Sequence, residues 1–98
     1  MRIRAEPINP PVGDLEGNLR LILGRVQLAA HDGADLVVFP ELALTGYPPR
    51  DLLREPSFVA AVRSSIDQFV RETEGLGVTA VVGVPWGEPD HVAAGGLV

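Results

Sequence analysis

The chain has 98 residues, of which 46% are apolar, and its 13 carboxylates against 8 arginines give it a formal net charge of −5. These values predict one soluble globular domain at most, and an acidic chain without a basic cluster argues against nucleic acids and anionic membranes as partners. The sequence has no cysteine, no signal-peptide pattern and no apolar run long enough to span a bilayer. We therefore expect a cytoplasmic protein without disulfides or thiolate metal sites.

The first part of the chain contains two candidate strands. The stretch IRAEPINP at 3–10 is a poor one, because Glu6 needs solvent or a partner and Pro7 lacks the N–H that a ladder uses. We therefore expect it at an edge of a sheet. The stretch DLVVF at 35–39 is short, β-branched and apolar at odd and even positions, which is typical of a strand covered on both faces.

Two amphipathic helices are predicted by apolar residues with helical spacing. The first covers 15–30, with Asp14 at its N-cap and Gly33 at the left-handed position that ends a helix. The second begins at Pro56, covers 57–74 and ends at the sequence EGLG. The apolar positions are Leu15, Leu19, Ile22, Leu23, Val26 and Ala30 in the first helix, and Phe58, Val62, Ile66, Phe69 and Val70 in the second.

The last part of the chain predicts two further strands. VTAVVGV at 78–84 is apolar almost throughout and ends in Pro85, while VAAGGLV at 92–98 is a strand weakened by its two adjacent glycines. The element order is then strand-helix-strand-helix-strand-strand with short connections. This order predicts an α/β layer with right-handed crossovers.

Glu41 is the strongest candidate for chemistry. In open α/β sheets, ligands bind beyond the carboxyl ends of the strands, and Glu41 follows the predicted strand 35–39 at that end. Pro40 restricts the backbone before it, so the carboxylate can be aimed and can act as a general base. The alternative is a structural carboxylate that caps the loop or pairs with Arg50.

Tyr47 and the histidines are the other residues considered for a site. Tyr47, in the loop TGYPP, offers a ligand a hydroxyl and a flat apolar face, or else packs over the loop. His31 lies near a helix end and is expected to be structural, and His91 has no second histidine or carboxylate cluster at metal spacing. No metal site is predicted. The serines all lie on the second predicted helix, so no Ser-His-Asp triad can be argued.

The stretch ADLVVFPELALTGYPPRDLL at 34–53 resembles the glutamate-bearing motif of the nitrilase (carbon–nitrogen hydrolase) superfamily. Its second part, TGYPP-x-DLL, and the earlier stretch NPPVGDLEGN at 9–18 are similar to the glutaminase domain of the glutamine-dependent NAD synthetases. The resemblance implies a four-layer α-β-β-α sandwich. Residues 1–98 would form the N-terminal part of such a domain and not a complete one.

The resemblance also implies a site. In that family a glutamate base, a lysine and a cysteine nucleophile hydrolyse an amide, and Glu41 falls on the base while Tyr47 falls on a residue that lines the glutamine pocket. The full-length enzyme would hydrolyse glutamine and pass ammonia to a second domain, which uses ATP and Mg²⁺ to amidate deamido-NAD. This sequence has no lysine and no cysteine, so the chain alone is expected to be inactive. The implied partners are glutamine, the remainder of the glutaminase domain, a synthetase domain and further copies in a homo-oligomer.

The sequence departs from the family pattern near both ends. Arg4, Glu6 and Pro7 stand where the pattern has small apolar residues and a glutamine, and DHVAAGGLV at 90–98 replaces a strand that typically opens with Tyr-Asn. Two alternatives stay open. One is another amidohydrolase of the superfamily, against which TGYPPRDLL weighs, and the other is a non-catalytic remnant or interaction module.

Overall fold

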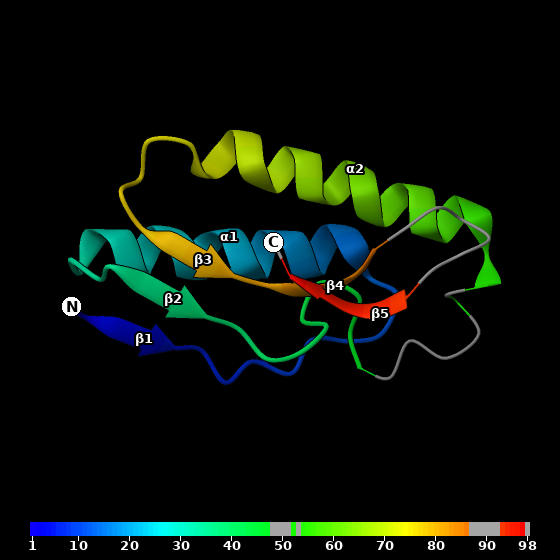
Figure 1. The fold of residues 1–98 in the computed structure, drawn as a ribbon, viewed down its shortest axis with the longest axis horizontal. Coiled ribbons are helices and arrows are strands. Elements are labelled where there is room, and N and C mark those ends of the chain that lie inside the picture. The colour runs from blue at the N-terminus through cyan, green and yellow to red at the C-terminus, as the bar shows by residue number, and fades with distance from the viewer. Residues whose placement is uncertain (48–51, 53, 87–92, 98) are drawn as a thin grey trace.

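The computed structural model describes residues 1–47, 52, 54–86 and 93–97 of the chain. Within these residues, parallel strands alternate with helices and an antiparallel pair of strands follows (Figure 1). In chain order the elements are β1 (Ile3–Ala5), α1 (Leu15–His31), β2 (Leu36–Val38), α2 (Pro56–Thr73), β3 (Thr79–Val81), β4 (Gly83–Trp86) and β5 (Ala93–Leu97). The predicted α/β class is confirmed.

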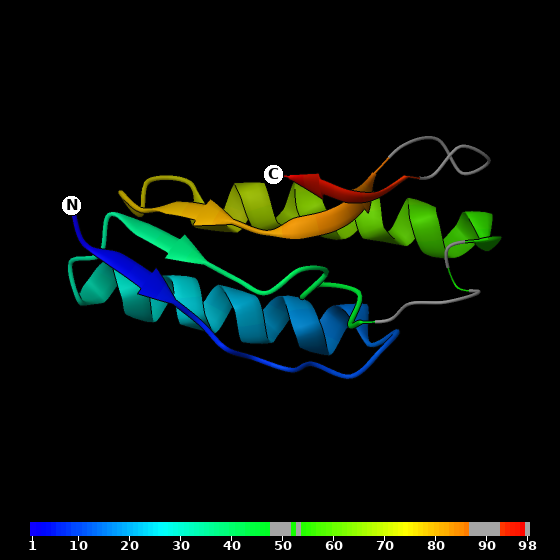
Figure 2. The ribbon, with the colours of Figure 1, turned by 60° about the horizontal axis from the view of Figure 1, so that its bottom comes forward.

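The parallel sheet has the order β1-β2-β3, so β1 lies at an edge, as its sequence predicts, and β2 is central. Ile3 pairs with Leu36, and Leu36 pairs with Thr79 on the other side. Both crossovers step across the sheet in the same direction, and two crossovers of the same hand then place their helices on the same face. Figures 1 and 2 show α1 and α2 side by side on one face of the sheet.

The helices begin and end close to the predicted residues. Asp14 caps α1, since its Oδ1 accepts a hydrogen bond of 3.1 Å from the Gly17 N–H. Gly33 follows α1 with a φ of 79°, which is the left-handed conformation expected there. α2 begins with Pro56, but the preceding residue, Glu55, makes no side-chain cap bond.

The buried face of α2 differs from the prediction at two positions. Val70 is 54% exposed, whereas Val59, which was not among the predicted apolar positions, is 1% exposed. Consecutive helical residues point in different directions, and Val70 lies one step around the helix from the buried Phe69. The buried stripe of α2 therefore includes Val59 in place of Val70, while Phe58 at its start is partly buried against the core.

A single apolar cluster fills the space between the helices and the sheet. Its buried residues are Leu19, Ile22, Leu23, Val26 and Ala29 of α1, Val62, Ile66 and Phe69 of α2, and Val37, Phe39, Ala43, Leu44, Val82 and Val84. Removing these side chains from water is the main term that stabilises the layer. In the described part of the chain, no helix is long and apolar enough to cross a membrane.

The predicted strand at 78–84 is divided in the structure. β3 pairs in parallel with β2 as far as Val81, and β4 pairs antiparallel with β5, which confirms the last predicted strand. Val82, between β3 and β4, is 1% exposed and belongs to the core. Pro85 lies inside β4 and not at its end. A register shift between Val84 and Trp86 accommodates a residue that lacks a backbone N–H.

The two faces of the parallel sheet differ in burial. Alternate residues of a strand point to opposite faces, and Val37 and Phe39 are buried on the helical side. Leu36 and Val38 point the other way and are only half-buried, while Ile3 on β1 is 63% exposed. In the described residues the helices cover one face of strand 35–39, and the cover expected on its second face stays a prediction.

Candidate active site

The carboxyl end of β2 leads directly to Glu41. The Phe39 N–H donates to the Val81 carbonyl at 3.0 Å, so pairing with β3 continues past the last residue of β2. Pro40 and Glu41 follow, and Glu41 is exposed at the start of a turn. Glu41 thus lies where the sequence predicts it, beyond the carboxyl end of the central strand, which is the edge at which open α/β sheets bind ligands.

A hydrogen-bonded turn follows Glu41. The Ala43 N–H donates to the Pro40 carbonyl at 3.2 Å, and the Gly46 N–H donates to the Leu42 carbonyl at 2.9 Å. Leu42 has a φ of 57°, which is uncommon for a residue other than glycine and persists only where the surroundings hold it.

The turn is buried although it lies at the end of the sheet. Leu42, Ala43, Leu44 and Thr45 are all at most 2% exposed. The Thr45 hydroxyl lies 3.3 Å from the Leu42 carbonyl and 3.1 Å from the Gly46 carbonyl, so its proton has an acceptor within the turn. The backbone between Glu41 and Tyr47 is therefore fixed by packing as well as by hydrogen bonds.

Tyr47 follows the turn and its side chain is largely open to solvent. It is 65% exposed, so most of its surface is open to solvent in the described structure. Arg50, the alternative partner predicted for Glu41, lies outside the described residues, and so does His91. His31 is exposed in the last turn of α1.

A small hollow of about 250 Å³ lies at the carboxyl ends of β1 and β2, and its last lining residue directly precedes Glu41. The lining residues are Ala5, Glu6, Pro7, Val38, Phe39 and Pro40. Glu6 is 5% exposed, and its two oxygens lie 2.9 Å from Arg4 Nε and 3.5 Å from Arg25 Nη1. The predicted need of Glu6 for a partner is confirmed. Both oxygens of Glu6 are paired with arginines of the described structure, which fits a structural role.

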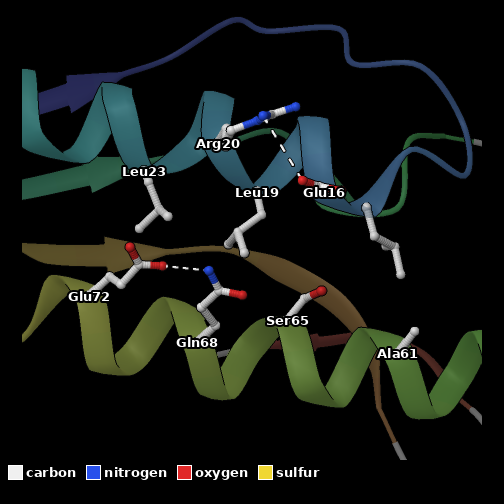
Figure 3. A pocket seen from close by; sticks show the side chains of 9 residues that line it. Glu16, Leu19, Arg20, Leu23, Ala61, Ser65, Gln68 and Glu72 are labelled. Carbon is white, nitrogen blue, oxygen red and sulfur yellow. Dashed lines mark hydrogen bonds and ion pairs between the residues drawn. The ribbon is translucent and has the colours of Figure 1, made fainter.

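A larger hollow of about 560 Å³ lies between α1 and α2 (Figure 3). Four of its polar side chains contact one another in pairs: Arg20 lies 4.0 Å from Glu16, and Gln68 donates to Glu72 at 2.7 Å. Its lining residues come from the helical layer and include neither Glu41 nor Tyr47. Volume alone therefore does not mark the site in this chain.

Asn18 is a buried polar residue near the turn that sequence reasoning missed. It is 1% exposed, and its Nδ2 donates to the Pro11 carbonyl at 2.8 Å and to the Leu44 carbonyl at 2.9 Å. The signal was present, because Asn18 lies between Leu15 and Ile22 on the apolar stripe of α1. A polar side chain in such a stripe must find partners inside the protein.

Metal binding finds no support in the described residues. They contain no group of three or more histidines, cysteines, aspartates and glutamates that could hold a metal ion.

Comparisons with known proteins agree on one family. The sequence model of the carbon-nitrogen hydrolase family matches residues 2–94. The glutamine-dependent NAD(+) synthetase of Thermotoga maritima is 39% identical over 98 residues, which are 100% of this chain and 17% of the relative. That of Xylella fastidiosa (strain Temecula1) is 42% identical over 86 residues, which are 87% of this chain and 15% of the relative. The chain therefore spans less than a fifth of the length of these curated relatives.

Solved structures show the same fold. A glutamine-dependent NAD(+) synthetase from Cytophaga hutchinsonii superposes with a TM-score of 0.86 at 21% identity, covering 96% of this chain and 16% of that one. An amidase from Nesterenkonia sp. superposes with a TM-score of 0.71 at 30% identity, covering 88% of this chain and 32% of that one. These likenesses confirm the nitrilase-like fold.

Proposed function

The chain belongs to the carbon–nitrogen hydrolase family, and from this premise we propose that residues 1–98 are the N-terminal part of the glutaminase domain of a glutamine-dependent NAD synthetase. In this proposal Glu41 is the general base and Tyr47 lines the pocket for glutamine. The observation that carries it is the position of Glu41, exposed beyond the carboxyl end of the central strand and followed by a buried turn. The identities of 39% and 42% to synthetases support the choice of substrate.

In this proposal, hydrolysis of glutamine needs three groups placed around the side-chain amide. The base removes the proton of a thiol, the thiolate attacks the side-chain amide, and a cation stabilises the oxyanion that forms. The carbon–nitrogen bond then breaks, and the protonated base gives its proton to the leaving ammonia, so that a thioester remains. Water attacks the thioester with the help of the same base, and glutamate and the thiol are released.

Glu41 suits the part of the base in this sequence of steps. Its carboxylate is exposed, and the backbone on either side is restricted by Pro40 and by the turn that ends at Gly46. The 98 residues include no cysteine and no lysine, so the thiol and the cation come from another part of the enzyme in this proposal. The chain alone would then be inactive toward glutamine.

ATP and Mg²⁺ belong, in this proposal, to a separate synthetase domain that amidates deamido-NAD with the ammonia. The described residues offer no cluster of metal ligands, and no step assigned to this chain passes through a metal ion. The partners in this proposal are glutamine, the remainder of the glutaminase domain, the synthetase domain and further copies of the enzyme. The enzyme would then be a cytoplasmic homo-oligomer. With a net charge of −5, neither nucleic acid nor an anionic membrane is among them.

The test is the variant Glu41→Gln in the full-length enzyme, which keeps the shape of the side chain and removes the proton acceptor. Loss of a general base typically lowers a rate by about 10²–10⁴-fold. We expect glutamine-driven synthesis of NAD to fall by that order, while synthesis from added ammonium persists, because the synthetase domain is unchanged.

The matched control is Glu16→Gln, which replaces another exposed glutamate, on α1, whose partner Arg20 is 4.0 Å away. Both activities of this control should stay within about twofold of the parent, since exposed ion pairs contribute little. Equal loss of the glutamine-driven and ammonia-driven activities in Glu41→Gln would point to a structural glutamate and contradict the proposed function.

A further inference from the structure

The segment that carries Glu41 and Tyr47 is held by contacts from two distant parts of the chain. One is the loop before α1, where the Gly13 N–H donates to the Thr45 carbonyl at 2.9 Å. The other is α1 itself, from which Asn18 reaches the Leu44 carbonyl. Both contacts fall on the part of the turn that lies between the two candidate site residues.

Asn18 uses both protons of its side-chain amide in this arrangement. One is donated to the Pro11 carbonyl at 2.8 Å and the other to the Leu44 carbonyl at 2.9 Å. The Asn18 side chain is 1% exposed, and its bond to Leu44 is buried, so the Leu44 carbonyl cannot exchange this donor for bulk water at low cost, whereas the bond to Pro11 is part-buried. Asn18 therefore binds the loop before α1 to the turn after β2 and fixes the distance between them.

The turn approaches the loop before α1 so closely that the space between them cannot hold a side chain at position 46. Gly46 has a φ of 78°, and a Cβ placed on it would lie 2.6 Å from Val12 Cα and 2.7 Å from the Pro11 carbonyl oxygen. Real side chains do not approach backbone atoms so closely, so only glycine fits. The turn therefore packs directly against the backbone at 11–12, and Asn18 donates one hydrogen bond to each of these two segments.

We propose that Asn18 is a positioning residue, which holds the Pro40–Gly46 turn so that Glu41 and Tyr47 face the same substrate. This inference rests on the proposed function, since it matters for catalysis only if Glu41 is the base. Asn18 touches neither substrate nor the reacting atoms. It acts through the Leu44 carbonyl, three positions from each of the two residues that it orients.

The test uses Asn18→Ala in the full-length enzyme, with active sites counted by a thiol-directed affinity label. A base displaced by about 1 Å can cost about 10²-fold in rate. We expect kcat for glutamine hydrolysis per labelled site to fall by about that factor, with ammonia-driven synthesis unchanged. A residue that only stabilised the fold would lower the number of labelled sites and leave kcat per site at the parental value, and that result would overturn the proposal.

The matched control is Gln27→Ala, which removes an exposed amide from the same helix and should change neither quantity by more than about twofold. If Asn18→Ala does not fold, Asn18→Ser tests the same link, because its hydroxyl can donate only one hydrogen bond where Asn18 donates two. Parental kcat per site in Asn18→Ser would then overturn the proposal, and a loss of about 10²-fold would support it.

The two proposals fail in different ways. If Glu41→Gln retains glutamine hydrolysis, the proposed function is wrong whatever Asn18 does. If Glu41→Gln loses the activity while Asn18→Ala keeps the parental kcat per site, only the positioning role is wrong.

Discussion

Glu6 shows how a buried charge is accommodated at the edge of the sheet. A carboxylate taken from water must regain its hydration energy from charged hydrogen bonds. Arg4 and Arg25 supply them while their own side chains stay 33% and 43% exposed, so the arginines keep much of their hydration. Asp32 also accepts a hydrogen bond from Arg4, and this bond raises the pKa of Arg4. The group links β1 to both the middle and the end of α1.

We expect Glu6→Gln to lower the free energy of unfolding by about 1–2 kcal/mol, because charged hydrogen bonds are replaced by weaker neutral ones. The loss stays below the value for a fully buried ion pair, since both arginines can turn toward water. A urea titration of the full-length enzyme and its variant measures this difference. Glu72→Gln, which alters a carboxylate bonded to an exposed glutamine on α2, is the comparison and should change the free energy by less than about 0.5 kcal/mol. Equal changes in the two variants would contradict this account of Glu6.

Residues whose roles depend on sequence neighbours could be predicted, and those that depend on distant segments could not. The cap at Asp14 and the left-handed Gly33 follow from local rules for helix ends. Glu41 could be placed because a strand and a proline precede it. Asn18, by contrast, meets a carbonyl 26 positions away, and the positive φ of Leu42 is imposed by packing around the turn.

The two helices differ in how their first turns are satisfied. The first N–H groups of a helix have no partner within it and need a cap. Asp14 supplies one to α1. Glu55, at the start of α2, has the extended backbone of a cap residue, with φ −91° and ψ 111°, but its longer side chain makes no cap bond. The start of α2 is therefore less stabilised than the start of α1.

The variant Glu55→Asp should raise the free energy of unfolding by about 0.5–1 kcal/mol, since aspartate keeps the charge and can accept from the first turn. The opposite change, Asp14→Ala on α1, should lower it by about 0.5–2 kcal/mol. Thermal melts of the two variants beside the parent measure both effects. A lower melting temperature for Glu55→Asp would show that Glu55 already has a stabilising role that a cap cannot replace.

Among the strands, the sequence reveals which segments pair but not where the partner changes. The run at 78–84 is apolar almost throughout, so nothing in it marks Val82 as the end of one pairing and the start of another. The division between β3 and β4 is decided by β5, which pairs with β4 alone. For the same reason Pro85, which by itself signals a strand end, is retained inside β4.

At the scale of the molecule, one face of the parallel sheet leaves apolar side chains uncovered in the described structure. The helical layer covers the other surface, and the family resemblance predicted both this layer and the need for a second sheet. Ile3 is 63% exposed, and Leu36 and Val38 are half-buried on the open side. Exposed apolar sheet surfaces and unpaired edges promote association between chains.

We therefore expect the 98-residue chain on its own to self-associate or to be partly unfolded. Size-exclusion chromatography with light scattering, followed by a urea titration, tests this expectation. Ile3→Glu, on the open side, should reduce the associated fraction. Leu28→Glu, on α1 where the side chain is 43% exposed, should not reduce it. A monodisperse monomer with a sharp cooperative transition would contradict the expectation and favour an independent module.

The contacts of Asn18, Gly13 and Gly46 that hold the Pro40–Gly46 turn have a consequence for the order in which the protein folds during synthesis. Every hydrogen bond among these contacts lies within the first 46 residues, and the β1–β2 pairing is complete at Val38. Chains emerge from the ribosome N-terminus first, and local groups can form before the rest is made. The geometry around Glu41 can thus begin to assemble before α2 has emerged from the ribosome, and the later strands then pack against a turn that already has its shape.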